Sequence, residues 1–139
     1  NMLKLLIPVL LLSSGLTLAQ TPKTVSDVVQ LQGSYNATIE QVQKNVVNMY
    51  VPDGGVAVLD ITGQDRFLSY TKNTTYMKVE IKSSGKTVAI KSDVDDGYTY
   101  SLAVETLCGR SISVNIIGIS SKNTPDKIKP KLLISAPSC

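Results

Sequence analysis

Residues Tyr76–Lys82 read Tyr-Met-Lys-Val-Glu-Ile-Lys, and this stretch decides the class of fold. Its apolar and charged residues alternate strictly: Met77, Val79 and Ile81 against Lys78, Glu80 and Lys82. A period of two puts the two sets on opposite faces of an extended chain, whereas an α-helix would mix them. The stretch is therefore predicted to be a β-strand with one face in a core and the other in water.

The same pattern extends outward along the chain. Alternating segments lie at Tyr35–Glu40, Tyr98–Glu105 and Ser111–Ile116, with shorter β-rich candidates at Val28–Leu31, Val46–Val51, Val56–Thr62 and Thr87–Lys91. Turns rich in Gly, Asp and Ser separate them, and residues 38–48 are a weak case for a helix. We expect an all-β domain, a small β-sandwich or barrel-like fold of about eight short, mostly antiparallel strands.

The N-terminal twenty residues have the pattern of a targeting segment. Lys4 precedes the apolar run Leu5–Leu12, and small residues lead to Ala19. The run is too short for a membrane span and contains Pro8, so we expect a signal peptide cleaved after Ala19. The expected organisation is a signal peptide at 1–19, a β-sandwich domain at 20–121, and a Lys/Pro linker with the start of a further strand or tether at 122–139.

The composition argues against several kinds of chemistry. The 139-residue chain has no His, which excludes a Ser-His-Asp triad, a Cys-His pair and a histidine zinc ligand. Asp93, Asp95 and Asp96 suggest a calcium loop, but the EF-hand spacing then puts Val104 where Glu is needed. We therefore expect no enzyme, no catalytic residues, no cofactor and no metal site.

The formal net charge of +3 is too small to indicate nucleic-acid binding. The positive excess lies mostly in the C-terminal segment, whose Lys and Pro residues are typical of a linker. We expect the interaction residues there: Lys127, Lys129, Lys131, Leu132, Leu133 and Ile134. In this interpretation Leu132–Ser135 adds a strand to a neighbouring chain, and deletion of residues 128–139 leaves the domain folded.

Two cysteines, Cys108 and Cys139, occur in the chain. In an oxidising compartment they can pair and restrain the C-terminal end. Alternatively, Cys139 stays free or links to a partner. The sequence leaves these outcomes open.

Three stretches resemble the N-terminal domain of the TraK family, the secretin-like components of F-type conjugative type IV secretion systems. They are Val28–Ser34, a short strand and turn; Asn45–Val56, an apolar strand ending in Pro-Asp-Gly-Gly; and Tyr98–Ile119, a late hairpin containing Glu105-Thr106 and Gly109. The resemblance covers roughly residues 25–121.

This resemblance implies a structural role in the periplasm, at an outer-membrane core complex. The implied partners are other copies of the chain in a ring, an outer-membrane lipoprotein and an inner-membrane-anchored scaffold protein, without direct nucleic-acid binding. The alternative is a stand-alone exported β-sandwich module that binds a glycan or a protein ligand. The two differ in whether the purified chain assembles or stays monomeric.

Overall fold

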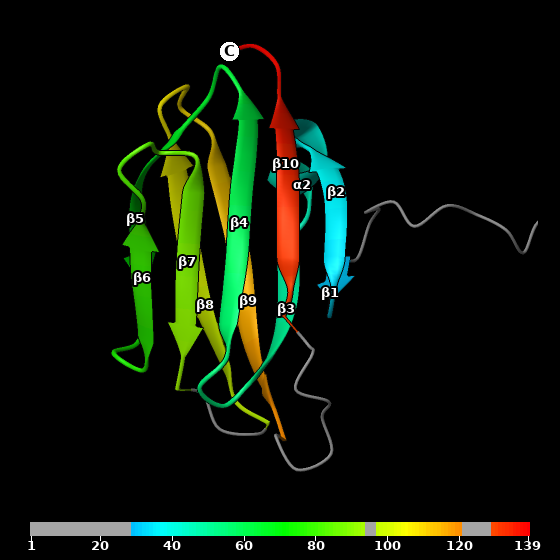
Figure 1. Ribbon diagram of the computed structural model, residues 1–139, viewed down its shortest axis with the longest axis vertical. Helices are drawn as coiled ribbons and strands as arrows, with labels where there is room; N and C mark the ends of the chain where they lie inside the picture. The colour runs from blue at the N-terminus through cyan, green and yellow to red at the C-terminus, as the bar shows by residue number, and fades with distance from the viewer. Residues whose placement is uncertain (1–28, 94–96, 121–128) are drawn as a thin grey trace, which may run out of the picture.

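A computed structural model describes residues 29–93, 97–120 and 129–139 of the chain (Figure 1). The expected signal peptide, Asp95, Asp96 and Lys127 lie outside these ranges. The described residues form two five-stranded sheets packed face to face, which confirms the all-β, sandwich-like class. Within them, no helix is both long enough and apolar enough to cross a membrane.

The first sheet, called sheet A, has the order β1-β3-β9-β8-β5. Its strands are β1 (Val29–Leu31), β3 (Val47–Pro52), β9 (Ser111–Ile119), β8 (Thr99–Thr106) and β5 (Phe67–Lys72). The pairings of β1 with β3 and of β3 with β9 are parallel. Those of β9 with β8 and of β8 with β5 are antiparallel.

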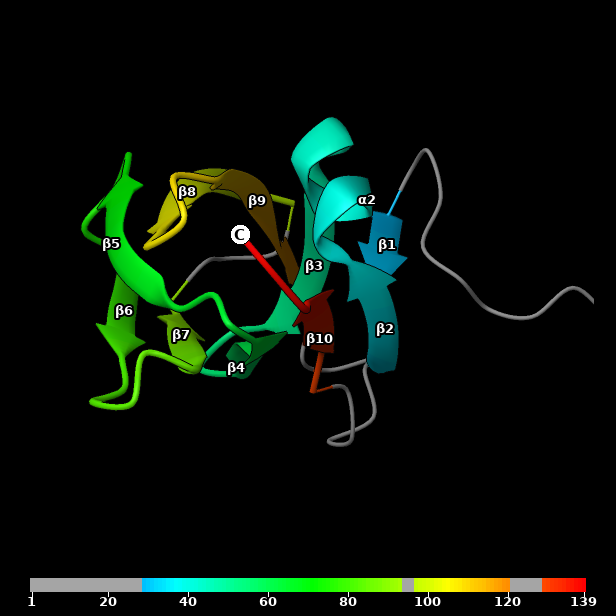
Figure 2. The same cartoon turned by 90° about the horizontal axis from the view of Figure 1, so that it is seen from above.

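The second sheet, called sheet B, has the order β2-β10-β4-β7-β6. Its strands are β2 (Ser34–Thr38), β10 (Lys131–Ala136), β4 (Val56–Gly63), β7 (Thr87–Ser92) and β6 (Met77–Ile81). It repeats the scheme of sheet A, because β10 is parallel to both β2 and β4 while β7 is antiparallel to β4 and β6. Seen from above, β1 and β2 form one side of the sandwich and β5 and β6 the other (Figure 2).

The strand count and the strand directions differ from the sequence-based expectation. The described residues hold ten strands, and half of the strand pairings are parallel. The reason is that the chain changes sheet repeatedly, so consecutive strands pair in one sheet only at the β6–β7 and β8–β9 hairpins. A parallel pair requires such a crossover, because a tight hairpin can join only antiparallel strands.

A short helix of about one and a half turns, α2 (Ile39–Lys44), follows β2 directly. Thr38 starts it with a capping box: its hydroxyl accepts from the Gln41 N–H at 3.2 Å, and the Gln41 side chain accepts from the Thr38 N–H at 2.8 Å. Ile39 and Val42 are buried, which ties the helix to the core. The alternation that predicted a strand through Glu40 therefore ends two residues early, at the cap.

The core lies between the sheets and is made of the inward-facing residues of their strands. Its largest fully buried side chains are Leu31, Ile39, Met49, Leu59, Ile61, Met77, Ile90, Ile112, Ile116, Leu132 and Ile134. Burial of each such side chain contributes about 1.5–3 kcal/mol relative to its exposure to water. Leu132 and Ile134 of β10 are thus part of the same core as the rest of the domain.

The position of β10 corrects the expected domain boundary at residue 121. This C-terminal strand lies in the interior of sheet B, bonded to β2 on one side and β4 on the other. Leu132, Ile134 and Ala136 are fully buried. The expectations of a tether, and of a domain that stays folded without residues 128–139, are therefore wrong, since sheet B would lose a central strand.

Candidate functional site

The outer face of sheet A carries a row of amide and hydroxyl groups that runs across the strands. The Ser101 hydroxyl donates to Asn115 Oδ1 at 3.2 Å, and Asn115 Nδ2 donates to Asn48 Oδ1 at 3.0 Å. The strand register aligns these residues, since Asn115 is paired with Ser101 on β8 and with Asn48 on β3. Just past β5, Asn73 Oδ1 accepts from the Ser101 N–H at 3.1 Å. We call Asn48, Asn73, Ser101 and Asn115 the amide row.

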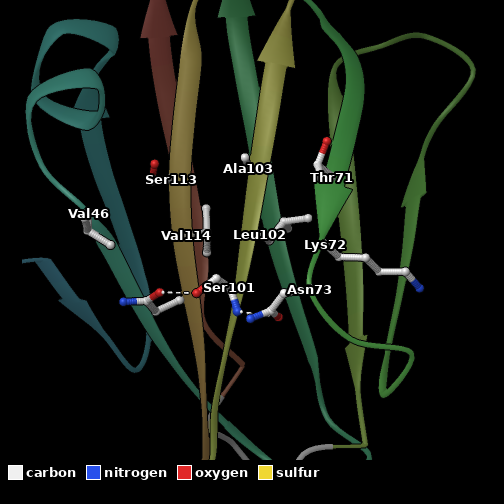
Figure 3. Close-up of a pocket in the computed structure, with 10 residues that line it drawn as sticks. Val46, Thr71, Lys72, Asn73, Ser101, Leu102, Ala103, Ser113 and Val114 are labelled. Atoms are coloured by element: carbon white, nitrogen blue, oxygen red, sulfur yellow. Dashed lines mark hydrogen bonds between the residues drawn. The ribbon is translucent and has the colours of Figure 1, made fainter.

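A shallow hollow of about 370 Å³ lies over part of this face (Figure 3). Its polar lining comes from small uncharged side chains: Thr71, Asn73, Ser101, Ser113 and Asn115. Val46, which follows α2, and Ala103 on β8 add apolar surface. Lys72 also borders the hollow, but its ammonium is turned aside and donates to the Met77 carbonyl at 2.6 Å (Figure 3).

The chemistry that this lining offers is hydrogen bonding without charge. Amides and hydroxyls both donate and accept, so they suit a neutral polar ligand or the backbone of another chain. No Asp or Glu lines the hollow. Across the described ranges, no three His, Cys, Asp or Glu residues come close enough to hold a metal ion.

A second site binds the C-terminal end to the loops at one pole of the sandwich. Cys108, in the β8–β9 turn, forms a disulfide with Cys139, with 5.4 Å between their Cα atoms. Arg110 Nη2 donates to the Ser138 carbonyl at 2.7 Å, and Arg110 Nη1 lies 3.3 Å from Asp65 Oδ2. We call Asp65, Arg110, Ser138 and the disulfide the C-terminal latch.

Asp65 is the centre of the latch and is completely buried. Burial by itself raises the pKa of its carboxyl. Hydrogen bonds from the Thr106 hydroxyl, from the Cys108 and Arg66 N–H groups and from the Arg110 guanidinium outweigh burial, and the pKa lies below its ordinary value of 3.8. The carboxylate is thus held ionised and joins the β4–β5 loop to the β8–β9 turn.

The latch also involves close approach of backbones at Gly63, the last residue of β4. Gly63 has a φ of +97°, and a Cβ there would overlap the Ala136 carbonyl. The same carbonyl accepts from the Gln64 N–H at 3.0 Å. Lys86 Nζ donates to the carbonyls of Gly63 and Asp65, at 2.7 Å each. These two bonds tie the loop between β4 and β5 to the start of β7.

The interaction residues expected in the C-terminal segment differ in their exposure to solvent in the structure. Leu132 and Ile134 are buried and unavailable to a partner, which corrects their assignment as interaction residues. Leu133 is half-buried on the outer face of sheet B, and Lys131 there pairs with Asp60 at 3.2 Å. Lys129 is exposed.

Sequence reasoning missed the amide row and the latch. Alternation in Ser111–Ile116 places Ser113 and Asn115 on the outer face, but it does not reveal the partners that the register supplies. The stretch Gly63-Gln64-Asp65 has the composition of a polar turn. No local signal distinguishes a buried carboxylate there from an exposed one.

The chain matches no protein-family model, and a comparison with curated proteins finds no match.

Proposed function

We propose that this chain is an exported structural subunit that acts through protein–protein contacts in a bacterial envelope assembly. The observation that carries the proposal is the latch: a disulfide and a buried ion pair fix the last strand inside a rigid sandwich. Disulfides persist in oxidising compartments such as the periplasm. A rigid domain that presents two sheet faces suits repeated contacts between subunits.

Within this class, we propose the outer-membrane core complex of a type IV secretion system as the assembly. Support comes from the resemblance of Val28–Ser34, Asn45–Val56 and Tyr98–Ile119 to the TraK family and from the expected signal peptide. The hollow, in which Lys72 is the one charged lining residue, and the small net charge of the chain fit a scaffold better than a carrier of DNA. The partners would be further copies of the chain, an outer-membrane lipoprotein and an inner-membrane-anchored scaffold protein.

The test is affinity isolation of the tagged chain from the envelope of cells that naturally make it, after mild detergent extraction. We expect co-purification of several copies of the chain with lipoprotein and scaffold subunits of a secretion system. The tag belongs outside the latch, since Cys139 takes part in it. A chain recovered from the cytoplasm, or recovered from the envelope as a monomer alone, would contradict the proposal.

The hollow on sheet A favours a second candidate function, a binding module for a neutral glycan or a protein ligand. Amide and hydroxyl groups that line a concave surface without charges are suited to hydroxyl-rich ligands. The probe is a series of neutral N-acetylated oligosaccharides, followed by shifts of backbone amide resonances. Shifts confined to β8, β9 and Thr71–Asn73 support this function, and their absence at millimolar sugar contradicts it for glycans.

A matched pair of variants makes this second test specific. Ala103→Trp fills the hollow on the outer face of sheet A. Ala89→Trp places the same side chain on the outer face of sheet B, where Ala89 is also half-buried. Glycan binding at the hollow would be lost in the first variant and kept in the second.

A further inference from the structure

The outer face of sheet A presents its small side chains in two parallel rows that run across the strands. The first is the amide row, which the pairing of β3, β9 and β8 aligns. The second lies two residues further along each strand and consists of Ser113, Ala103 and Thr71, which the strand pairing also aligns. Figure 3 shows members of both rows, and the hollow of about 370 Å³ lies over them.

The hollow is a trough whose long direction crosses the strands. Its floor is low because Ser101, Ala103 and Ser113 are small side chains at neighbouring positions of β8 and β9. Its lining extends from Val46, just before β3, to Asn73, just past β5. Four strand positions cover about 14 Å across a sheet, whereas two rows lie only about 7 Å apart along the strands. The shape therefore favours a linear ligand that lies across the sheet.

The hydrogen bonds within the amide row leave donors at both of its ends. Asn48 accepts from Asn115, and Asn73 accepts from the Ser101 N–H, each through its Oδ1. Within the part of the chain that the structure describes, neither Asn48 Nδ2 nor Asn73 Nδ2 donates to a protein acceptor. Each of these nitrogens carries two N–H groups, so the row offers donors to the oxygens of a ligand that lies along it.

The spacing of the row distinguishes between kinds of linear ligand. Neighbouring strands lie about 4.8 Å apart, so hydrogen-bonding groups recur along the row at that interval. The side chains on one face of an extended peptide recur at about 6.7 Å, which does not match. One pyranose in a β-1,4-linked chain advances by close to the strand spacing. Such a chain can therefore place one sugar over each position of the amide row.

The lining also indicates which sugars the ligand contains. Carboxamides donate to and accept from other amides, so the amide row suits N-acetylated sugars better than sugars with hydroxyls alone. Lys72 is the one charged lining residue, and its ammonium donates to the Met77 carbonyl, so the trough does not select an acidic sugar. Beside the amide row, the paired and half-buried Tyr50 and Ile117 add apolar surface on the same face for the C–H face of a sugar ring.

From these observations we propose that the trough binds a linear, neutral, β-1,4-linked glycan of N-acetylated sugars. The glycan lies across β3, β9, β8 and the end of β5, with one sugar at each position of the amide row. The proposal rests on the second candidate function, because it names the ligand class, the linkage and the orientation at that same site.

The test measures the affinity of the full chain for β-1,4-linked N-acetylglucosamine oligomers of two to six sugars by isothermal titration calorimetry. We expect Kd to fall at least tenfold from the dimer to the tetramer, because each added sugar reaches a further position of the amide row. From the tetramer to the hexamer Kd should change less than twofold, since the row has ended. Shifts of backbone amide resonances should extend across the sheet from Asn48 to Asn73.

Two further ligands separate the linkage from the acetamido groups. A tetramer of α-1,4-linked glucose is neutral but curved, and it should not bind. A tetramer of β-1,4-linked glucose has the required spacing without acetamido groups. It should bind at least tenfold more weakly than the N-acetylglucosamine tetramer.

Matched variants connect the length dependence to the row. Asn48→Ala and Asn73→Ala each remove the donors at one end, and each should abolish the gain in affinity from the trimer to the tetramer. Asn36→Ala is the control, because Asn36 is an exposed Asn on the outer face of sheet B, and it should leave every Kd unchanged. Equal melting temperatures of the purified variants show that the fold is intact.

The opposite results reject the proposal and separate it from the function on which it rests. A smaller gain from the dimer to the tetramer, equal binding of either glucose tetramer, or normal length dependence in both Asn→Ala variants rejects this glycan and its orientation, while glycan binding at the hollow stands. No resonance shift with any oligomer at millimolar concentration rejects this inference together with the second candidate function for glycans. Neither result bears on the role of the chain as a structural subunit.

Discussion

Asp65 is completely buried and yet ionised, because neighbouring groups donate hydrogen bonds to its carboxylate and stabilise the charge. Replacement by Asn keeps the shape but leaves the Arg110 guanidinium without its charge partner. We expect Asp65→Asn to lower the free energy of unfolding at neutral pH by about 3–5 kcal/mol, as is usual when one member of a buried pair is removed. Urea denaturation of the two proteins measures this difference.

The same substitution changes the dependence of stability on pH. The folded-state pKa of Asp65 lies below the ordinary 3.8, so its contribution is full above 3.8 and is lost as the pH falls through the folded-state pKa. The stability difference between wild type and Asp65→Asn should therefore shrink in acid. A difference that stays constant from neutral pH to well below 3.8 would contradict this role.

Gly63 is constrained by both its backbone conformation and its contact with β10. Gly63→Ala must overcome a positive φ and the overlap of its Cβ with the Ala136 carbonyl. Gly54→Ala is the matched control, because Gly54 has a φ of +77° and no atom within 4 Å of its added Cβ. Thermal unfolding should show the greater loss of stability for Gly63→Ala, and equal losses would argue against the close approach.

At the level of elements, β10 is the strand on which sheet B depends. Ile134 faces the core and is fully buried, while its neighbour Leu133 faces outward and is half-buried. We expect Ile134→Ala to cost about 2–5 kcal/mol, the usual range for a large-to-small change in a core. Leu133→Ala, on the same strand, should cost clearly less in the same denaturation experiment. Similar costs would mean that β10 is not inserted as described.

The disulfide restrains the end of this strand. It closes a loop with a sequence separation of 31 residues, for which the usual stabilisation is about 2–4 kcal/mol. Cys108→Ser with Cys139→Ser should lower the unfolding midpoint accordingly, and reduction of the wild type should give the same midpoint as the variant. If reduction leaves the midpoint of the wild type unchanged, the latch does not stabilise β10.

Alternation predicted most strands correctly but not their partners, for reasons that are visible in particular elements. β5 carries no alternating signal, because Phe67 is its one buried residue and the four residues from Leu68 to Thr71 are all exposed. The apolar residues of β10 are visible in the sequence, but the Lys and Pro residues before them are typical of a linker and so do not predict a core strand. Its true neighbours, β2 and β4, lie far away in sequence, and no local pattern encodes a parallel pairing over such a distance.

At the scale of the whole molecule, the two sheets share one hydrophobic core, and their surface chemistry is unequally distributed. One end carries the latch, and the outer face of sheet A carries the uncharged amide row. Among the described residues, the edge strands are β1 and β5 in sheet A and β2 and β6 in sheet B (Figure 2).

The most direct measurement is electron microscopy of the native envelope assembly that contains this chain. The proposed function predicts a symmetric ring at the outer membrane, with one β-sandwich in each repeat. Envelope particles without this chain in a repeating position, or a protein found only as free monomers, would contradict it.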